Sequence, residues 1–236
     1  MTPAHVRGEL ARLVQLLLES GFALAANSSV ITRLGGNEEL VTWTGLANSV
    51  LAPDQTPRVA EYRFFLATKQ YTCVLTDGSL LQLSYRFRRG QIVWHRLSYH
   101  PCPILFGPAE IQPQDDLIEL VDLFLEDELK SELGSHPLSP HTDCRLRLRS
   151  PIRFDFDSAS AATNHPAVHV TVNSHLCRIP VFAPLSIGQF VRFVFKNFYP
   201  VEWAAQSLVR DWPVTFQNRT ITPIQEREIH VACQGA

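Results

Sequence analysis

The chain has 236 residues, of which 45% are hydrophobic and 19% are charged, and its formal net charge is -2 at pH 7. This length and apolar fraction are enough for a well-packed core, so we expect a globular protein. The nearly balanced charge excludes a protein that binds nucleic acid through overall basicity. Local basic strips remain the electrostatic route to phosphate.

Targeting signals and cysteine motifs are missing from the sequence. There is no apolar run long enough to span a membrane and no basic segment followed by an apolar one at the N-terminus. We therefore expect a cytoplasmic protein without membrane contact. The five cysteines are scattered without a CxxC pair, which predicts buried small side chains rather than disulfides or a zinc site.

The first half of the chain begins with a helical pattern and continues with strand patterns. Apolar residues recur at helical spacing over residues 4–20, and Gly21 ends this pattern. A Gly35-Gly36 turn within residues 29–44 predicts a hairpin. An antiparallel meander should follow, stopped by Pro101 and Pro103. Its predicted strands are residues 62–68, 71–76, 79–87 and 91–99.

The second half alternates helices and strands in a different order. Residues 117–129 form a predicted helix within an acidic region, since Glu110 to Glu132 holds nine acidic residues against Lys130 alone. A flexible connection at residues 135–141 and a second β region from Cys144 to about Arg178 are expected next. The remaining predicted elements are a helix capped by Ser186, a helix opened by Pro200 and a strand at residues 224–232.

This order of elements predicts an α+β fold, in which an antiparallel sheet packs with N-terminal, middle and two C-terminal helices. We expect a single domain over residues 1–236. A subdivision into 1–134 and 142–236 is the alternative, because the predicted connection lies between them.

Chemically capable side chains concentrate in the second β region. Alternate side chains of a strand share a face, which places Arg153, Asp155 and Asp157 together. In the following strand, His169 and Asn173 point away from the valines. If the two segments pair as a hairpin, the Arg/Asp face lies beside His169.

Three interpretations of this face remain open. In the first, a metal-independent site uses His165, His169 and Asp155 as catalytic groups. Its phosphate-binding arginines would be Arg145, Arg147, Arg149, Arg153 and Arg178. In the second, the polar side chains only pair with one another or with water. In the third, a metal binds after the chain bends at His165, since two histidines four residues apart in a strand lie about 13 Å apart. We expect neither a metal nor a cofactor.

Other segments carry weaker signals. Glycine-rich phosphate loops, nucleophile elbows and HExxH zinc motifs are absent from the sequence. In WHRLSYHPCP, His95 and Tyr99 share one strand face while Trp94, Arg96 and Ser98 share the other, so we interpret His95 as part of a buried aromatic cluster. The aromatic residues of the C-terminal helices are either core or a partner interface. The interface prediction names Phe198, Tyr199 and Trp203.

Several sequence blocks resemble an uncharacterised bacterial family, the domain of unknown function DUF2290. They are DGSLLQLSYRF, HRLSYHPCP, IRFDFD, HPAVHVTVNSHLCRIP and FVRFVFKNFYP, spread over Tyr62 to Pro200. The resemblance implies no reaction, because the family has none established. It implies an accessory protein of mobile or defence-type loci.

We therefore expect an accessory subunit of a bacterial defence-type or mobile-element system. It would act in a protein complex in a nucleic-acid context, with a protein partner and with RNA or single-stranded DNA as a further ligand. The alternative is a ribonuclease-like enzyme that uses the His/Arg/Asp face. The sequence leaves open whether the protein is an enzyme.

Overall fold

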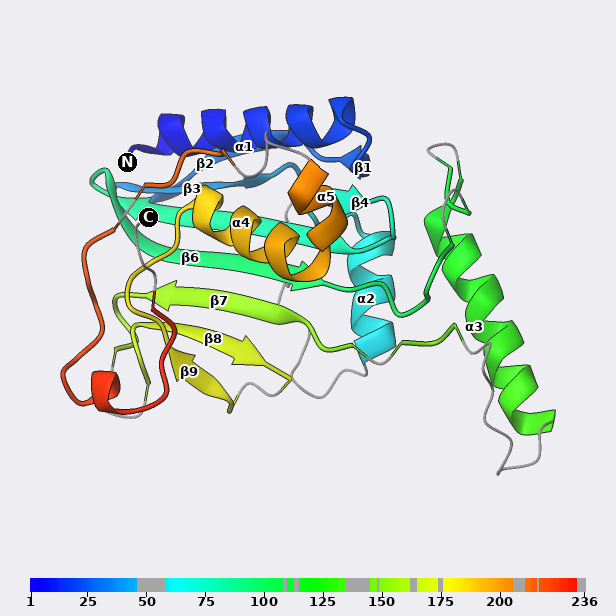
Figure 1. Ribbon diagram of the computed structural model, residues 1–236. Coiled ribbons are helices and arrows are strands. Elements are labelled where there is room, and N and C mark those ends of the chain that lie inside the picture. Colours follow the sequence, from blue (N-terminus) through cyan, green and yellow to red (C-terminus); the bar gives the residue numbers. More distant parts are fainter. Residues whose placement is uncertain are drawn as a thin grey trace.

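The structure is a computed structural model and describes residues 1–45, 58–107, 110–112, 115–134, 145–147, 149–161, 165–173, 176–205, 211–215 and 217–232. An antiparallel sheet with helices on both faces forms the protein, which confirms the predicted α+β class (Figure 1). The helices are α1 (Pro3–Glu19), α2 (Arg58–Ala67), α3 (Leu117–Gly134), α4 (Ile187–Phe198), α5 (Pro200–Ala205) and the 3-10 helix η1 (Gln225–Arg227). The strands are β1 (Ala23–Ala26), β2 (Ser29–Gly35), β3 (Glu38–Trp43), β4 (Cys73–Leu75), β5 (Leu80–Arg88), β6 (Gln91–His100), β7 (Ile152–Asp157), β8 (Val168–Val172) and β9 (Arg178–Pro180).

The two predicted β regions form one sheet. Its strand order is β1-β4-β5-β6-β7-β8-β9, and the β2–β3 hairpin joins it through β3 and β5. Strand β5 therefore pairs with β4 at its beginning and with β3 at its end. The β6–β7 ladder links the halves, and in the β7–β8 ladder Asp155 lies directly opposite His169. The predicted hairpin is thus confirmed.

The first hydrophobic core lies between one face of the sheet and the helices α1 and α4 (Figure 1). Helix α1 begins at the cap Thr2 and buries apolar residues of one stripe, among them Leu10 and Leu13. Helix α4 begins with the predicted cap Ser186, whose side chain forms a capping box with Gln189. Both helices thus begin where their sequences predict.

A second core lies on the opposite face, where α2 packs on one end of the sheet and α3 packs beside α2 (Figure 1). Here Tyr62, Phe65 and Leu66 of α2 pack with Val74 and Leu80. The predicted strand at residues 62–68 was therefore wrong. These three residues are spaced three and four apart, which aligns them on one face of a helix.

Two smaller predictions are corrected and one lies outside the described residues. Residues 224–232 contain η1 and a single parallel bridge between Val181 and Val231 instead of a strand. The cause is local, because Thr222 and Gln225 bond each other's backbone N–H groups through their side chains and close a turn. Cys73 and Cys102 are buried as predicted, but Cys177 is exposed. The predicted connection at residues 135–141 lies outside the described residues.

His95 is fully buried in the first core, as predicted, with the rings of Tyr85 and Phe156 beside it. The backbone N–H of Leu185 donates a 3.1 Å hydrogen bond to Nε2 of His95. This nitrogen must therefore be unprotonated. Burial lowers the pKa of His95 to about 4.

We expect the free energy of unfolding to fall as the pH drops, because His95 takes up a proton more readily in the unfolded chain. The stabilisation is complete above the unfolded pKa of about 6.5 and is lost toward pH 4. Between pH 7.5 and pH 5, the loss of free energy of unfolding that is due to His95 is about 2 kcal/mol. Urea unfolding at both pH values checks this. In the variant His95→Gln, whose side chain can still accept from Leu185 but does not titrate, the pH dependence should shrink by that amount, and an unchanged dependence would refute the assignment.

Candidate functional site

Polar side chains lie in rows across neighbouring strands in the middle of the sheet, on the face opposite α1 and α4. The ladders place Arg96 opposite Asp155 and Asp155 opposite His169, while Ser98, Arg153 and Thr171 form the neighbouring row. Residues directly opposite in antiparallel strands project to the same side. We call this surface the arginine face. It comprises Ser84, Arg86, Trp94, Arg96, Ser98, Arg153, Asp155, His169, Thr171 and Arg178.

Asp155 lies at the centre of the arginine face and is 7% exposed. Its Oδ1 accepts from Nε of Arg96 at 2.9 Å, and its Oδ2 accepts from Nε of Arg153 at 2.5 Å. Burial raises the pKa of the carboxyl, but the two guanidinium groups outweigh it, and the net pKa lies below its usual range. Asp155 is therefore ionised at neutral pH and holds two arginines in place.

His169 is 4% exposed and contacts its own turn and Asp155. Its Nδ1 lies 3.2 Å from the carbonyl oxygen of Pro166, which can only accept, so the proton resides on Nδ1. Its Nε2 lies 3.8 Å from Oδ2 of Asp155. Burial lowers the pKa of His169 in spite of the nearby carboxylate, so the ring is neutral at pH 7.

His165 is half-buried and lies against His169, with ring centroids 5.0 Å apart. The chain thus bends between the two histidines, where a continuous strand would have separated them. The structure brings the three predicted catalytic residues together. Among the described residues, however, no group of three His, Cys, Asp or Glu side chains is placed to hold a metal ion.

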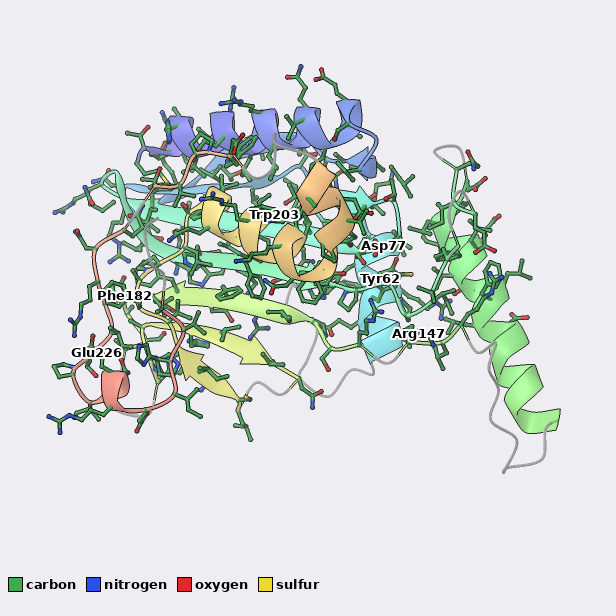
Figure 2. The ribbon with its side chains drawn as sticks, viewed as in Figure 1. Tyr62, Asp77, Arg147, Phe182, Trp203 and Glu226 are labelled. Carbon is green, nitrogen blue, oxygen red and sulfur yellow. The ribbon has the colours of Figure 1, made fainter. Side chains whose placement is uncertain are left out.

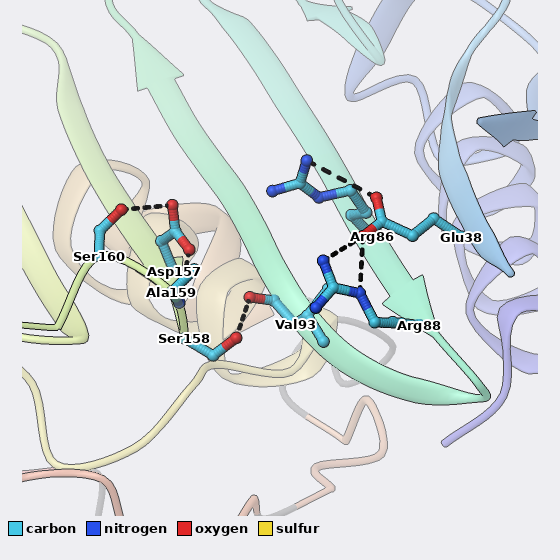
Figure 3. Close-up of polar contacts among 8 residues, drawn as sticks. All are labelled: Glu38, Arg86, Arg88, Val93, Asp157, Ser158, Ala159 and Ser160. Carbon is cyan, nitrogen blue, oxygen red and sulfur yellow. Dashed lines mark hydrogen bonds and ion pairs between the residues drawn. The ribbon is translucent and has the colours of Figure 1, made fainter. Parts of the chain in front are cut away.

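Trp94 and Arg96 belong to the same face, although sequence reasoning gave them no role. The guanidinium carbons of Arg86 and Arg96 lie 5.8 and 5.7 Å from the Trp94 ring centroid. At the rim, Arg86 and Arg88 both pair with Glu38 (Figure 3). The sequence signal for their position was that Trp94, Arg96 and Ser98 alternate with His95 and therefore share the other face of the strand. Their link to Asp155 could be recognised only once β6 was known to pair with β7.

Asp157 has a separate role, in the turn that follows β7. Its carboxylate accepts from the backbone N–H of Ala159 at 2.9 Å and from the hydroxyl of Ser160 at 2.8 Å, while Ser158 donates to the carbonyl of Val93 (Figure 3). These bonds close the loop that leaves β7. Asp157 therefore shapes the edge of the arginine face, while Asp155 organises its centre.

One comparison with known proteins finds a match, to the family described as an uncharacterized conserved protein (DUF2290), over residues 22–233. The chain belongs to the DUF2290 family. No curated protein and no solved structure matches it. The matched region covers nearly the whole fold and includes every residue of the arginine face.

The remaining predicted phosphate-binding arginines of the DUF2290 chain lie in two places. Arg178 extends the arginine face through its pairing with Thr171, whereas Arg149 is exposed in the segment before β7. Arg145 and Arg147 flank the bridge between Leu146 and Ile104, near α3 (Figure 2). Arg145 is bound there to Glu110 at 2.9 Å and lies over the ring of Phe124. The structure thus places Arg153 and Arg178 in one row of the arginine face, two strands apart, but Arg145 and Arg147 lie elsewhere.

The predicted partner residues of the DUF2290 chain are half-buried against the first core. Phe198 stacks on Tyr99 with ring centroids 4.6 Å apart. The hydroxyl of Tyr199 donates to the carboxylate of Asp77, at 3.0 Å from each oxygen. Trp203 lies on α5 above the same end of the sheet (Figure 2). Much of the aromatic surface therefore fastens α4 and α5 to the sheet, and a role in partner binding stays a prediction.

Proposed function

We propose that this DUF2290 protein is a non-catalytic accessory subunit that contacts RNA or single-stranded DNA through the arginine face. The observation that carries the proposal is the grip of Asp155 on Arg96 and Arg153. One carboxylate holds two guanidinium groups, so the centre of the face keeps a positive charge. Half-buried arginines with a surplus of positive charge are suited to phosphate.

The N–H groups of the Arg153 guanidinium support phosphate binding. A guanidinium has five N–H donors, and the ion pair with Asp155 occupies Nε. The side chain of Arg153 is 29% exposed, and Arg178 lies two strands away in the same row. Trp94, next to Arg86 and Arg96, adds an aromatic surface of the kind on which unpaired bases stack.

Cleavage is supported less well than binding. His169 is nearly inaccessible, and its nitrogens face the Pro166 carbonyl and the Asp155 carboxylate. General acid or base catalysis requires a nitrogen within hydrogen-bonding reach of the substrate. His165 is better exposed, so a ribonuclease-like alternative would depend on His165 with His169 behind it.

The protein partner is supported by helix α3, which extends beside the sheet (Figure 1). Its described part carries acidic side chains, and Leu123 is 55% exposed. An acidic helix with an exposed apolar residue fits a basic, partly apolar partner surface. The setting in a bacterial defence-type or mobile-element system rests on the family resemblance alone. None of the described helices is long and apolar enough to cross a membrane.

The double variant Arg153→Gln/Arg178→Gln tests nucleic-acid binding. We expect labelled single-stranded RNA or DNA to bind the variant 10- to 100-fold more weakly at low salt, because two phosphate contacts are lost. The slope of log affinity against log salt should fall by about 1.4. Fluorescence anisotropy at several salt concentrations measures both quantities, with a duplex of the same sequence for comparison.

The matched control is Arg7→Gln/Arg227→Gln, which removes the same charge from exposed positions on α1 and η1. It should bind like the unmodified chain. Equal weakening in both variants would show that only net charge matters and would refute the arginine face. The same reactions, separated on a denaturing gel, should contain intact nucleic acid. Cleavage that disappears in His165→Ala would assign the function to the ribonuclease-like alternative instead.

A further inference from the structure

Two hydroxyl groups flank Arg153, and neither forms a hydrogen bond with the residues that the structure describes. Ser98 is 0% exposed and Thr171 is 8% exposed, and each lies directly opposite Arg153 in its ladder. The Oγ of Ser98 and the Oγ1 of Thr171 have no partner within the described part of the chain. Because the opposite face holds the core, both side chains project onto the arginine face.

Unbonded hydroxyl groups at these positions are unfavourable for the free protein. A buried polar atom without a partner loses its bonds to water and gains none in return. Alanine or valine would fit the same sheet positions without this cost. Two such groups on either side of one guanidinium therefore indicate a site whose bonds are completed by a ligand.

We propose that Ser98, Arg153, Thr171 and Arg178 form a track for consecutive phosphates of one nucleic-acid strand. The inference rests on the proposed function and names the part of the ligand that is bound. The hydroxyl and guanidinium groups can all donate, and phosphate oxygens only accept. Because Ser98 and Thr171 are 0% and 8% exposed, binding requires neighbouring side chains to move toward the ligand so that phosphate reaches both hydroxyl groups.

The length of this row of residues indicates whether the ligand is a single phosphate group or a nucleic-acid strand. The four residues lie on the neighbouring strands β6, β7, β8 and β9. Three strand spacings make a row of about 14 Å, which is longer than one phosphate group. The track thus crosses the strands, and the sugar-phosphate backbone of an oligonucleotide fits it better than inorganic phosphate does.

The double variant Ser98→Ala/Thr171→Val tests the track. We expect its affinity for a labelled oligonucleotide of eight nucleotides to fall about tenfold, while its urea midpoint without ligand stays the same or rises. Thr171→Ser, which keeps the hydroxyl group, should retain affinity. Affinity of the unmodified chain should rise along a series of two, four and eight nucleotides, with inorganic phosphate competing poorly.

Each outcome has a distinct meaning. Unchanged affinity of the hydroxyl variant, beside weakened binding of Arg153→Gln/Arg178→Gln, would overturn the track and leave the proposed function intact. Unchanged affinity of both variants would overturn the proposed function as well. A lowered urea midpoint would show that the hydroxyl groups stabilise the free fold, and strong competition by inorganic phosphate would indicate a single-anion site. Either result would overturn the track.

Discussion

Replacing Gly188 by alanine should destabilise the protein by more than about 3 kcal/mol, which is in the range of severe core mutations. Gly188 lies in the first turn of α4, where the chain of residues 211–215 packs closely against it. A Cβ atom at this position would lie 2.1 Å from the carbonyl oxygen of Pro213 and 3.0 Å from Cδ1 of Trp212. Backbone cannot yield as a flexible side chain does, so α4 or the segment with Trp212 must move. Urea unfolding measures the loss.

Gly8→Ala is the matched control, because Gly8 also lies in a helix, but beyond its own helix backbone no described atom lies within 4 Å of the point that a Cβ would occupy. This change should raise the free energy of unfolding by about 0.5–1 kcal/mol, since alanine is the better helix former. Equal midpoints for Gly188→Ala and the unmodified chain would contradict the close packing of α4 on Trp212 and Pro213.

Replacing Asp155 by asparagine should change stability and binding in opposite directions. The neutral amide leaves Arg96 and Arg153 without their counter-charge, which should lower the free energy of unfolding by about 2 kcal/mol. This figure is below that of a fully buried pair because the two arginine side chains are 18% and 29% exposed and partly screened by water. The affinity for single-stranded nucleic acid should nevertheless rise several-fold, since a negative charge leaves the arginine face.

Urea unfolding and fluorescence anisotropy check the two effects on the same preparations. Glu228→Gln is the control, because it changes the net charge equally at an exposed position beside η1. It should alter neither quantity appreciably. Weaker binding of the Asp155→Asn variant would contradict phosphate binding by the freed arginines. Cleavage by the unmodified chain that Asp155→Asn abolishes would favour a catalytic carboxylate.

The local part of the candidate site could be predicted because strand geometry has a period of two residues. The alternation of Phe154 and Phe156 with Arg153 and Asp155 is enough to define a face, and pairing with the valine-rich β8 brings in His169. Sequence reasoning failed at α2, where Tyr62, Phe65 and Leu66 fit a strand or a helix. Packing on the second core decided between them.

The burial of the arginine face could not be predicted from alternation. Alternation indicates only that a face points away from the core, yet Asp155, His169 and Thr171 are 7%, 4% and 8% exposed. Neighbouring strands flank these residues on both sides, and Arg96 and Arg153 lie against Asp155. The second guanidinium group that contacts Asp155 belongs to Arg96 of β6. Because β6 and β7 are far apart in the chain, no local sequence pattern predicts that they pair.

The ladder between β6 and β7 also has a consequence for synthesis of the chain. Until β7 emerges from the ribosome, β6 pairs with β5 on one side only and is an edge strand, with Trp94, Arg96 and Ser98 beside open backbone groups. Addition of β7 closes this edge and supplies Asp155 in the same step. A nascent chain therefore completes the arginine face only when this edge is closed.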